Sequence, residues 1–400
     1  MVILSMYCNN IFMFRDFYLD FTYERKVNSA FPDNDSLFPE SKIKVRKSMV
    51  LMGGNAAGKT TFGKLLCAVN NFILGREVTS KYLNLSEVIY DKDKEASFIV
   101  EFAIDKTAYR VECIFNVDGL ISEVWIKQKI YNSYNIKKLR EKLMSSKDRV
   151  ERNYINDPAS RLDTNDDAVK PFYSKFLKDT NNETLLRFLM GNVKFHYLFS
   201  SFAEQSKETT IDIPIELLNK ILPIIDNSIK SVVRLRPDDE EIKNNSYLIA
   251  FRNGETLTIP DGDLRKADRN RLSHGTYEAL TFLNVLEEMK KERNSIIFVD
   301  EKLPHLHSEL EAYLIKKAFL VQRDSQVFFT SHNIELLDLN IPYNAFMLFR
   351  RNGEFNEAFF VNDKFNKNDR SLKNYYENDY FGILPDYSDL DVYFEGNNHE

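Results

Sequence analysis

The chain has few cysteines and no long apolar run. Its three cysteines, Cys8, Cys67 and Cys113, lie far apart and are odd in number. This usage argues against a disulfide framework or a cysteine-based zinc site and fits a reducing cytoplasm. No stretch approaches the run of about 18 apolar residues that a transmembrane helix requires. We therefore expect a cytoplasmic protein that does not span a membrane.

A strong charge of one sign is also missing. The net charge is −6 over 400 residues, so the overall balance gives no support for a dedicated nucleic-acid-binding protein, although a local basic groove is compatible with this sum. No heptad repeat is sustained, which argues against a long coiled coil. Hydrophobic residues make up 43% of the chain, enough for one large domain or a few smaller ones.

Residues 53–60 read Gly-Gly-Asn-Ala-Ala-Gly-Lys-Thr, the pattern of a Walker A phosphate-binding loop. Residues 48–52 predict an apolar strand before it and residues 61–66 a helix after it, which is the context the motif requires. Lys59 is expected to reach the β- and γ-phosphates, and the Thr60 hydroxyl to bind Mg²⁺. Backbone N–H groups at the helix N-terminus add positive potential. The residues expected to bind ATP here are Gly53, Asn55, Ala56, Ala57, Gly58, Lys59, Thr60 and Thr61.

A second motif, Leu-Ser-His-Gly-Thr at 272–276, opens a predicted amphipathic helix. Ser273 suits the N-cap of that helix, and Gly275 allows the backbone to approach an anion closely. We include Ser273 and Gly275 among the predicted nucleotide-binding residues.

Two further apolar runs end in polar residues with a chemical role. Residues 296–299 predict a buried strand that ends in Asp300 and Glu301. Asp300 would hold the Mg²⁺ shell as a Walker B aspartate does, and Glu301 would act as general base on the attacking water. Residues 327–330 predict a strand that leads to His332, which is well placed to contact a γ-phosphate. We therefore predict Glu301 and His332 as catalytic residues.

This order of motifs resembles that of ABC-type ATPases, in particular stand-alone members related to the OLD and SMC or recombination-repair proteins. The family pattern is matched further by Asn55, Thr276, Leu306-His307, His332-Asn333, Leu336-Leu337-Asp338 and a Gly-x-x-Pro ending at 382–385. No glutamine stands out as a Q-loop residue, since Gln128 and Gln205 are weak candidates. Pro304 and His305 replace the small or acidic residues usual before Leu-His.

The resemblance implies an α/β fold with an ABC-type ATPase head, in which a mixed sheet core is joined by an antiparallel β lobe. Strand patterns at 2–7 with 17–23, and at 97–104, 108–116 and 121–130, predict a hairpin and a meander for that lobe. The expected division is an N-terminal ATPase lobe at 1–130, a helical insertion at 131–213, a C-terminal ATPase lobe at 214–363 and a polar segment at 364–400.

The resemblance also implies a mechanism and a role. Two subunits would sandwich two ATP molecules, each P-loop being completed by Ser273 and Gly275 of the other subunit. The chain is similar to ATPase components of two-gene bacterial phage-defence systems, such as the AriA component of PARIS and the PtuA component of Septu. We therefore expect a homo-oligomer of ATP-sandwich dimers that acts as sensor or scaffold for a separate effector, often a nuclease, with a phage-encoded trigger.

Other roles stay open at this point. One is a DNA-repair or DNA-end-processing ATPase, for which DNA would be a partner that the net charge does not support. A transporter nucleotide-binding subunit would need a Leu-Ser-Gly-Gly-Gln signature and a clear Q-loop. A toxin resembling the anticodon nucleases would cut RNA itself. Too short a stretch follows His332 for an attached Toprim nuclease, which favours a separate effector.

Overall fold

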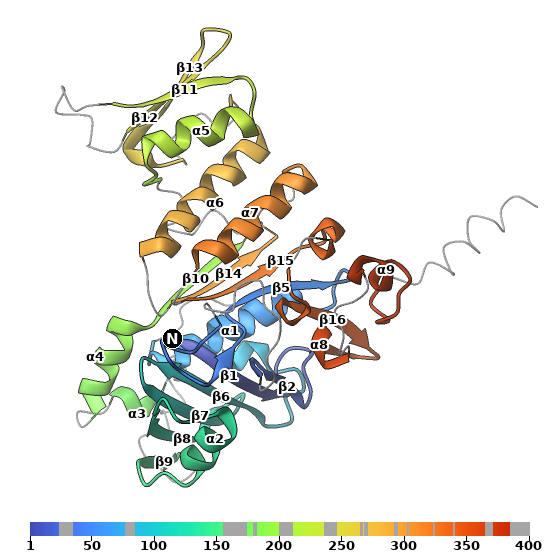
Figure 1. Cartoon of the computed structure of the whole chain (residues 1–400). Coiled ribbons are helices and arrows are strands. Elements are labelled where there is room, and N and C mark those ends of the chain that lie inside the picture. Colours follow the sequence, from blue (N-terminus) through green and yellow to red (C-terminus); the bar gives the residue numbers. More distant parts are fainter. Residues whose placement is uncertain are drawn as a thin grey trace, which may run out of the picture. The chain divides into compact units, whose positions relative to one another are not determined.

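The computed structural model describes most of the chain in two compact units. The first contains Met1–Phe195 and Thr330–Glu400, and the second contains His196–Phe329 (Figure 1). The described residues are 1–23, 35–76, 85–154, 174–178, 182–199, 211–235, 246–264, 267, 271–291, 295–301, 303, 305–322, 325–338, 341–364 and 371–384. The four-part division expected from the sequence stays a prediction.

An antiparallel sheet forms one layer of the first unit. Its strand order is β2-β1-β6-β7-β8-β9, and every neighbouring pair is antiparallel. The strands are β1 (Val2–Asn9), β2 (Phe17–Asp20), β6 (Ala96–Ile104), β7 (Thr107–Asn116), β8 (Gly119–Lys129) and β9 (Arg149–Asn153). The meander predicted from the sequence is confirmed, and the hairpin is confirmed for residues 17–20, whereas Thr22–Tyr23 form a separate strand that pairs with Lys44–Val45.

The P-loop lies in a smaller mixed arrangement of the same unit. Strand β5 (Ser48–Gly53) pairs in parallel with β16 (Phe346–Asn352), which pairs antiparallel with β17 (Phe355–Phe360). Helix α1 (Lys59–Ile73) follows β5 and buries Phe62 and Leu65 completely. The remaining elements here are β3 (Thr22–Tyr23), β4 (Lys44–Val45), α8 (Val361–Lys364), α9 (Leu372–Glu377) and the 3-10 turns η2 (Leu85–Val88), η8 (Ile334–Leu337) and η9 (Tyr343–Ala345).

The predicted helical insertion contains helices α2 (Ile136–Met144), α3 (Lys175–Lys178) and α4 (Glu183–Asn192). Asn135 caps α2 by accepting the Lys138 N–H at 2.9 Å. The guanidinium of Arg140 donates to both oxygens of Asp20 at 2.7 and 3.0 Å and to Glu101 at 2.9 Å. These charged contacts attach α2 to the antiparallel sheet.

The insertion also contributes two strands, β9 and β10 (Lys194–Phe199). The side chains of β9 are almost all exposed, so its sequence lacks the apolar alternation of a half-buried strand. Its pairing with β8 uses backbone groups at the edge of the sheet, which composition does not reveal.

One buried carboxylate fixes the insertion to β8. Glu123 is 1% exposed and accepts hydrogen bonds from Trp125 Nε1 at 3.0 Å, Ser174 Oγ at 2.6 Å and the Phe176 N–H at 2.9 Å. The Tyr154 hydroxyl donates to the same carboxylate. Because a buried carboxylate needs such donors, residues on both sides of 155–173 are held at one point.

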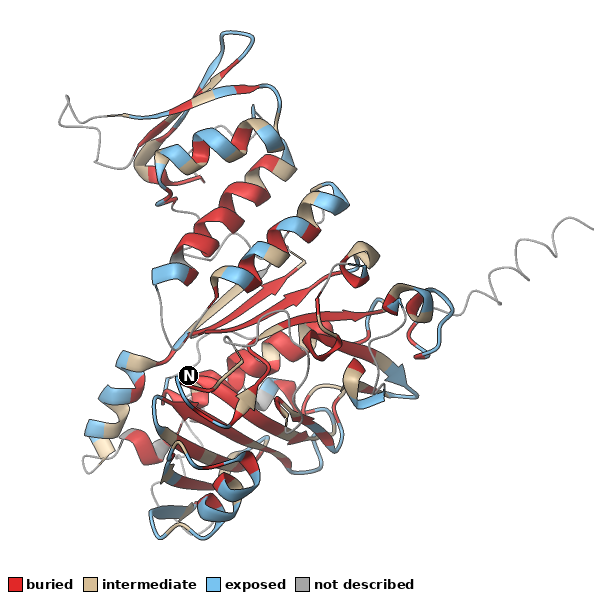
Figure 2. Ribbon diagram, in the orientation of Figure 1, coloured by how far each residue is buried: buried red, intermediate tan, exposed pale blue. Residues whose placement is uncertain are grey.

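The second unit contains β14 (Ser295–Asp300) and most of β10 and β15 (Gln326–Thr330), which lie side by side in the order β10, β14, β15. Figure 2 shows β14 and β15 buried along their lengths, as their apolar runs predict. Tyr197 of β10 stacks on Phe298 of β14, with ring centroids 5.0 Å apart. The unit also contains α6 (His274–Lys291) and α7 (Ser308–Val321).

A smaller antiparallel sheet completes the second unit. Strands β11 (Ile229–Arg234), β12 (Tyr247–Phe251) and β13 (Thr256–Ile259) pair in sequence order. Helix α5 (Ile215–Ile225) packs on β11, and the 3-10 turn η6 (Pro260–Gly262) follows β13.

The elements of the two units confirm the expected α/β class, with a mixed sheet, an antiparallel lobe and helices in the insertion. Within the described residues, no helix is both long and apolar enough to cross a membrane.

We predict that Glu123→Ala lowers the free energy of unfolding by about 3 kcal/mol, because it leaves several buried donors without an acceptor. Urea denaturation followed by tryptophan fluorescence and circular dichroism measures the change. Glu151→Ala is the control, since Glu151 forms an exposed ion pair with Arg149 on β9 and its loss should cost no more than about 0.5 kcal/mol. Equal effects of the two substitutions would contradict the role assigned to Glu123.

Candidate functional site

The predicted P-loop adopts a turn that ordinary residues rarely form. Strand β5 ends at Gly53 and helix α1 begins at Lys59. Between them, φ is 147° at Gly53, 58° at Ala56 and 104° at Gly58. The first helical bond runs from the Phe62 N–H to the Gly58 carbonyl at 2.8 Å. The strand–loop–helix context that the motif requires is therefore present.

Close packing explains why glycine occupies two of these positions. A Cβ atom on Gly53 would lie 2.2 Å from the carbonyl oxygen of Phe349 on β16. One on Gly58 would lie 2.6 Å from Nδ2 of Asn356 on β17, a side chain that is itself only 3% exposed. Positive φ and tight contact both require glycine here.

Lys59 lies inside the loop rather than in solvent. The residue is 4% exposed, and its ammonium donates to the carbonyls of Gly53 at 2.9 Å and Gly54 at 3.1 Å. A buried ammonium needs such acceptors, and charged phosphate oxygens are stronger acceptors than neutral carbonyls. Asn55 and Ala56 are exposed, whereas Thr60 and Thr61 are half-buried.

The segment that carries His332 adjoins the same strand. The Ser331 N–H donates to the Leu51 carbonyl at 3.1 Å, two positions before Gly53. Asn333 donates from its N–H to Ser331 Oγ at 3.0 Å and accepts the Glu335 N–H at 3.0 Å, which starts η8. His332 is exposed between these two anchored residues. The first unit thus brings the P-loop strand and the His332 segment together.

In the second unit, Ser273 caps helix α6 as predicted. Its hydroxyl oxygen accepts the Thr276 N–H at 3.0 Å and lies 2.7 Å from the Thr276 hydroxyl. That hydroxyl donates to Asp226 at 2.9 Å. Ser273 and His274 are exposed, so the N-terminus of α6 is open to a ligand or a partner.

Gly275 has a neighbour that the sequence did not reveal. A Cβ atom on this residue would lie 2.9 Å from the carbonyl oxygen of His305. The Glu278 carboxylate accepts the His305 N–H at 3.1 Å and lies 2.7 Å from its Nδ1. The rings of His274 and His305 are 5.3 Å apart. The motif at 272–276 and Glu278 therefore pack against His305.

The two predicted Walker B carboxylates occupy the end of β14. Asp300 is 5% exposed as the last residue of that strand. Glu301 is half-buried and has φ of 44°. Such a backbone conformation is costly for a non-glycine residue and is often found at functional sites.

The Q-loop residue is not identified by the structure. Gln205 lies outside the described residues, and the Gln128 side chain donates to the Lys129 carbonyl at 3.0 Å.

Sequence reasoning also missed a contact at the P-loop: a Cβ atom on Gly54 would lie 3.0 Å from the Ile383 carbonyl oxygen. The resemblance at 380–385 was the only signal for this contact, and Pro385 itself lies outside the described residues.

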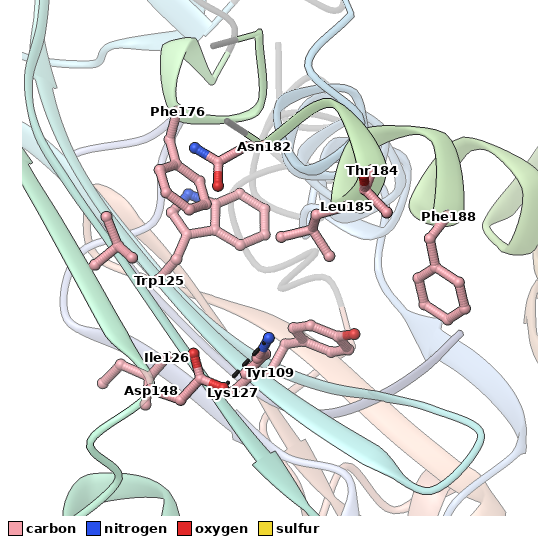
Figure 3. A pocket seen from close by; sticks show the side chains of 11 residues that line it. Tyr109, Trp125, Ile126, Lys127, Asp148, Phe176, Asn182, Thr184, Leu185 and Phe188 are labelled. Atoms are coloured by element: carbon pink, nitrogen blue, oxygen red, sulfur yellow. Dashed lines mark ion pairs between the residues drawn. The ribbon is translucent and has the colours of Figure 1, made fainter. Parts of the chain in front are cut away.

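A cavity of about 480 Å³ lies elsewhere in the first unit, between β7, β8, β9 and the insertion helices α3 and α4 (Figure 3). The side chains of Trp125 and Leu185 point into it, and an ion pair of 3.3 Å between Lys127 and Asp148 lies at its wall. None of its lining residues belongs to a predicted motif. They are Tyr109, Trp125, Ile126, Lys127, Asp148, Val150, Phe176, Asn182, Thr184, Leu185 and Phe188.

Comparisons with known proteins give low similarities. No protein-family model and no curated protein matches the chain. An SMC head bound to the C-winged helix domain of ScpA is 13% identical, with a TM-score of 0.44 over 91% of this chain and 100% of that one. An SMC head domain from Thermotoga maritima is 11% identical, with a TM-score of 0.41 over 90% and 99%.

The recombination mediator protein RecF with ATP is 11% identical, with a TM-score of 0.38 over 90% of this chain and 97% of that one. TM-scores this low do not decide a function.

We predict that Gly58→Ala lowers the free energy of unfolding by about 2 kcal/mol, because a methyl group there meets both a positive φ and the buried Asn356. Gly191→Ala is the control, since Gly191 lies in helix α4 with no atom within 4 Å of its Cβ position. That substitution should be neutral or stabilise by up to about 1 kcal/mol. A loss of equal size at Gly191 would show that the P-loop position is not special.

Proposed function

We propose that this chain is an ABC-type ATPase that binds and hydrolyses ATP. The observation that carries the proposal is the loop at 53–58, in which the buried Lys59 ammonium is held by loop carbonyls at the N-terminus of α1. The loop combines a tight turn, a helix N-terminus and one cation, features that together recognise phosphate groups. A glycine-rich turn without phosphate chemistry would not need a buried lysine.

The proposed roles of the other residues follow from their chemistry. Thr60 and Asp300 would hold Mg²⁺, which prefers oxygen ligands and keeps several waters, and which would neutralise charge on the phosphates when bound. Glu301 would take a proton from the attacking water. His332 would donate a hydrogen bond to the γ-phosphate.

We further propose that the active form is a homo-oligomer built from ATP-sandwich dimers. At the N-terminus of α6, Ser273 is exposed and Gly275 is half-buried beside it, which suits an anion presented by a second subunit. Loss of the γ-phosphate removes the group that both subunits bind, so hydrolysis would loosen the dimer. ATP is then both substrate and switch.

We propose that this dimer is the sensor or scaffold of a two-component, OLD-related phage-defence system acting in the cytoplasm, in the manner of AriA or PtuA. A separate effector, often a nuclease in such pairs, would be held by the ATPase and released on a phage-encoded trigger. The support is the family resemblance of the motifs, which is an argument by analogy. The alternative is a DNA-repair or DNA-end-processing ATPase, and the second experiment below separates the two.

The first experiment measures ATP binding and hydrolysis. Lys59→Ala should abolish nucleotide binding, because the cation is removed from the phosphate cradle. Glu301→Gln should keep ATP binding and lower kcat by about 1,000-fold, since the general base is lost. Isothermal titration and phosphate release report the two quantities. Unchanged affinity in Lys59→Ala would refute the P-loop assignment, and retained turnover in Glu301→Gln would mean that another group is the base.

The second experiment measures assembly by mass photometry. Glu301→Gln with Mg-ATP should form stable dimers that capture the product of the neighbouring gene. Ser273→Arg is the matched control, which should bind ATP and stay monomeric because the arginine blocks the N-terminus of α6. Dimers that ignore the neighbouring protein and shift on DNA in a salt-dependent manner would favour the repair alternative. Absence of any ATP-dependent association would refute the sandwich dimer.

A further inference from the structure

The segment 371–384 contacts two parts of the first unit, the P-loop and the chain that follows His332. At its start, Nζ of Lys373 on α9 lies 3.0 Å from Oε1 of Glu335 and 3.3 Å from Oδ2 of Asp338. The Ser371 hydroxyl donates to Asp338 at 3.3 Å. Glu335 and Asp338 lie in and directly after η8, the turn that begins beyond His332 and Asn333. The start of the segment is therefore attached to the chain that follows His332.

The end of the segment is a tight turn built on Asp379. This residue has φ of 48°, and its Oδ1 accepts the N–H groups of Ile383 at 2.7 Å and Leu384 at 2.9 Å. The Gly382 N–H donates to the Asp379 carbonyl at 3.0 Å. Ile383 is 5% exposed. A single carboxylate oxygen thus fixes the position of the Ile383 backbone.

The Ile383 carbonyl lies against Gly54 of the P-loop, where a Cβ atom would come within 3.0 Å of it. The carbonyl of the same Gly54 accepts the Lys59 ammonium at 3.1 Å. Gly54 is therefore confined between Lys59 on its own loop and Ile383. A bound phosphate that attracts the Lys59 ammonium would alter its hydrogen bond to the Gly54 carbonyl. The Ile383 carbonyl would still contact Gly54 from the other side.

We propose that residues 371–384 position the site for a nucleoside triphosphate by joining the P-loop to the His332 segment, and that Asp379 and Lys373 are positioning residues. The inference rests on the proposed ATPase function. Asp379 acts on the P-loop through Ile383 and Gly54, so it affects nucleotide affinity. Lys373 acts on the chain after His332, so it affects the hydrolysis step.

Substitutions at the two ends of the segment are expected to change different parameters, the Kd for Mg-ATP at one end and kcat at the other. Asp379→Ala should raise the Kd for Mg-ATP about tenfold and leave kcat at saturating ATP within about twofold of wild type. Lys373→Ala should lower kcat about fivefold with the Kd unchanged. Titration calorimetry and steady-state phosphate release measure the two parameters on the full chain. Circular dichroism and the binding stoichiometry report the folded fraction.

Two control variants separate positioning from general loss of structure. Asp379→Asn keeps an Oδ1 acceptor and tolerates positive φ, so it should restore wild-type affinity. Lys94→Ala removes an exposed ion pair with Asp91 in the same unit and should change neither parameter.

The inference is overturned if Asp379→Ala and Lys373→Ala both match wild type, or if both lose only folded fraction at constant Kd and kcat per folded molecule. If Asp379→Ala does not fold, Lys373→Ala against Lys94→Ala decides alone. Wild-type protein that neither binds nor hydrolyses ATP would instead refute the proposed function, which keeps the two failures distinguishable.

Discussion

The buried ammonium of Lys59 is the constraint on which the first unit depends. A cation that is 4% exposed needs acceptors, and the carbonyls of Gly53 and Gly54 supply them only because the loop turns inward. That turn needs glycine at 53 and 58, where β16 and β17 approach too closely for a side chain. The strands that flank β5 therefore shape the loop as much as the loop sequence does.

In the second unit, a glycine again allows close approach of a backbone carbonyl. Gly275 lets the His305 carbonyl approach helix α6, and Glu278 fixes His305 through both its backbone N–H and its ring. The contact joins the motif at 272–276 to the chain that follows Glu301. In the proposed dimer, a displacement of either segment would displace the other, because the Glu278 carboxylate holds His305 at both its backbone N–H and its ring.

The motifs could be predicted from the sequence because each makes demands on particular residue types. Positive φ and close contact require glycine at 53 and 58, and a buried strand before a carboxylate requires the apolar run ending at Asp300. Strand β9, the Ile383 contact with Gly54 and the His305 contact with Gly275 could not be predicted. Each depends on backbone atoms meeting across the fold, and backbone contacts leave no composition pattern. How the motifs of the two units combine stays a prediction.

Two of the non-glycine residues with positive φ lie in the proposed motifs, one in each unit. Ala56 and Glu301 hold φ of 58° and 44° without being glycine, which costs free energy that the surroundings must offset. Ala56 lies in a loop fixed by β16, β17 and Ile383, and Glu301 directly follows a fully buried strand. In the proposed ATPase, a motif whose backbone geometry is fixed during folding need not reorganise when charge develops on a bound phosphate, which is how fixed dipoles and charges accelerate phosphoryl transfer. The rigid packing around these loops is therefore part of the proposed chemistry rather than only of the fold.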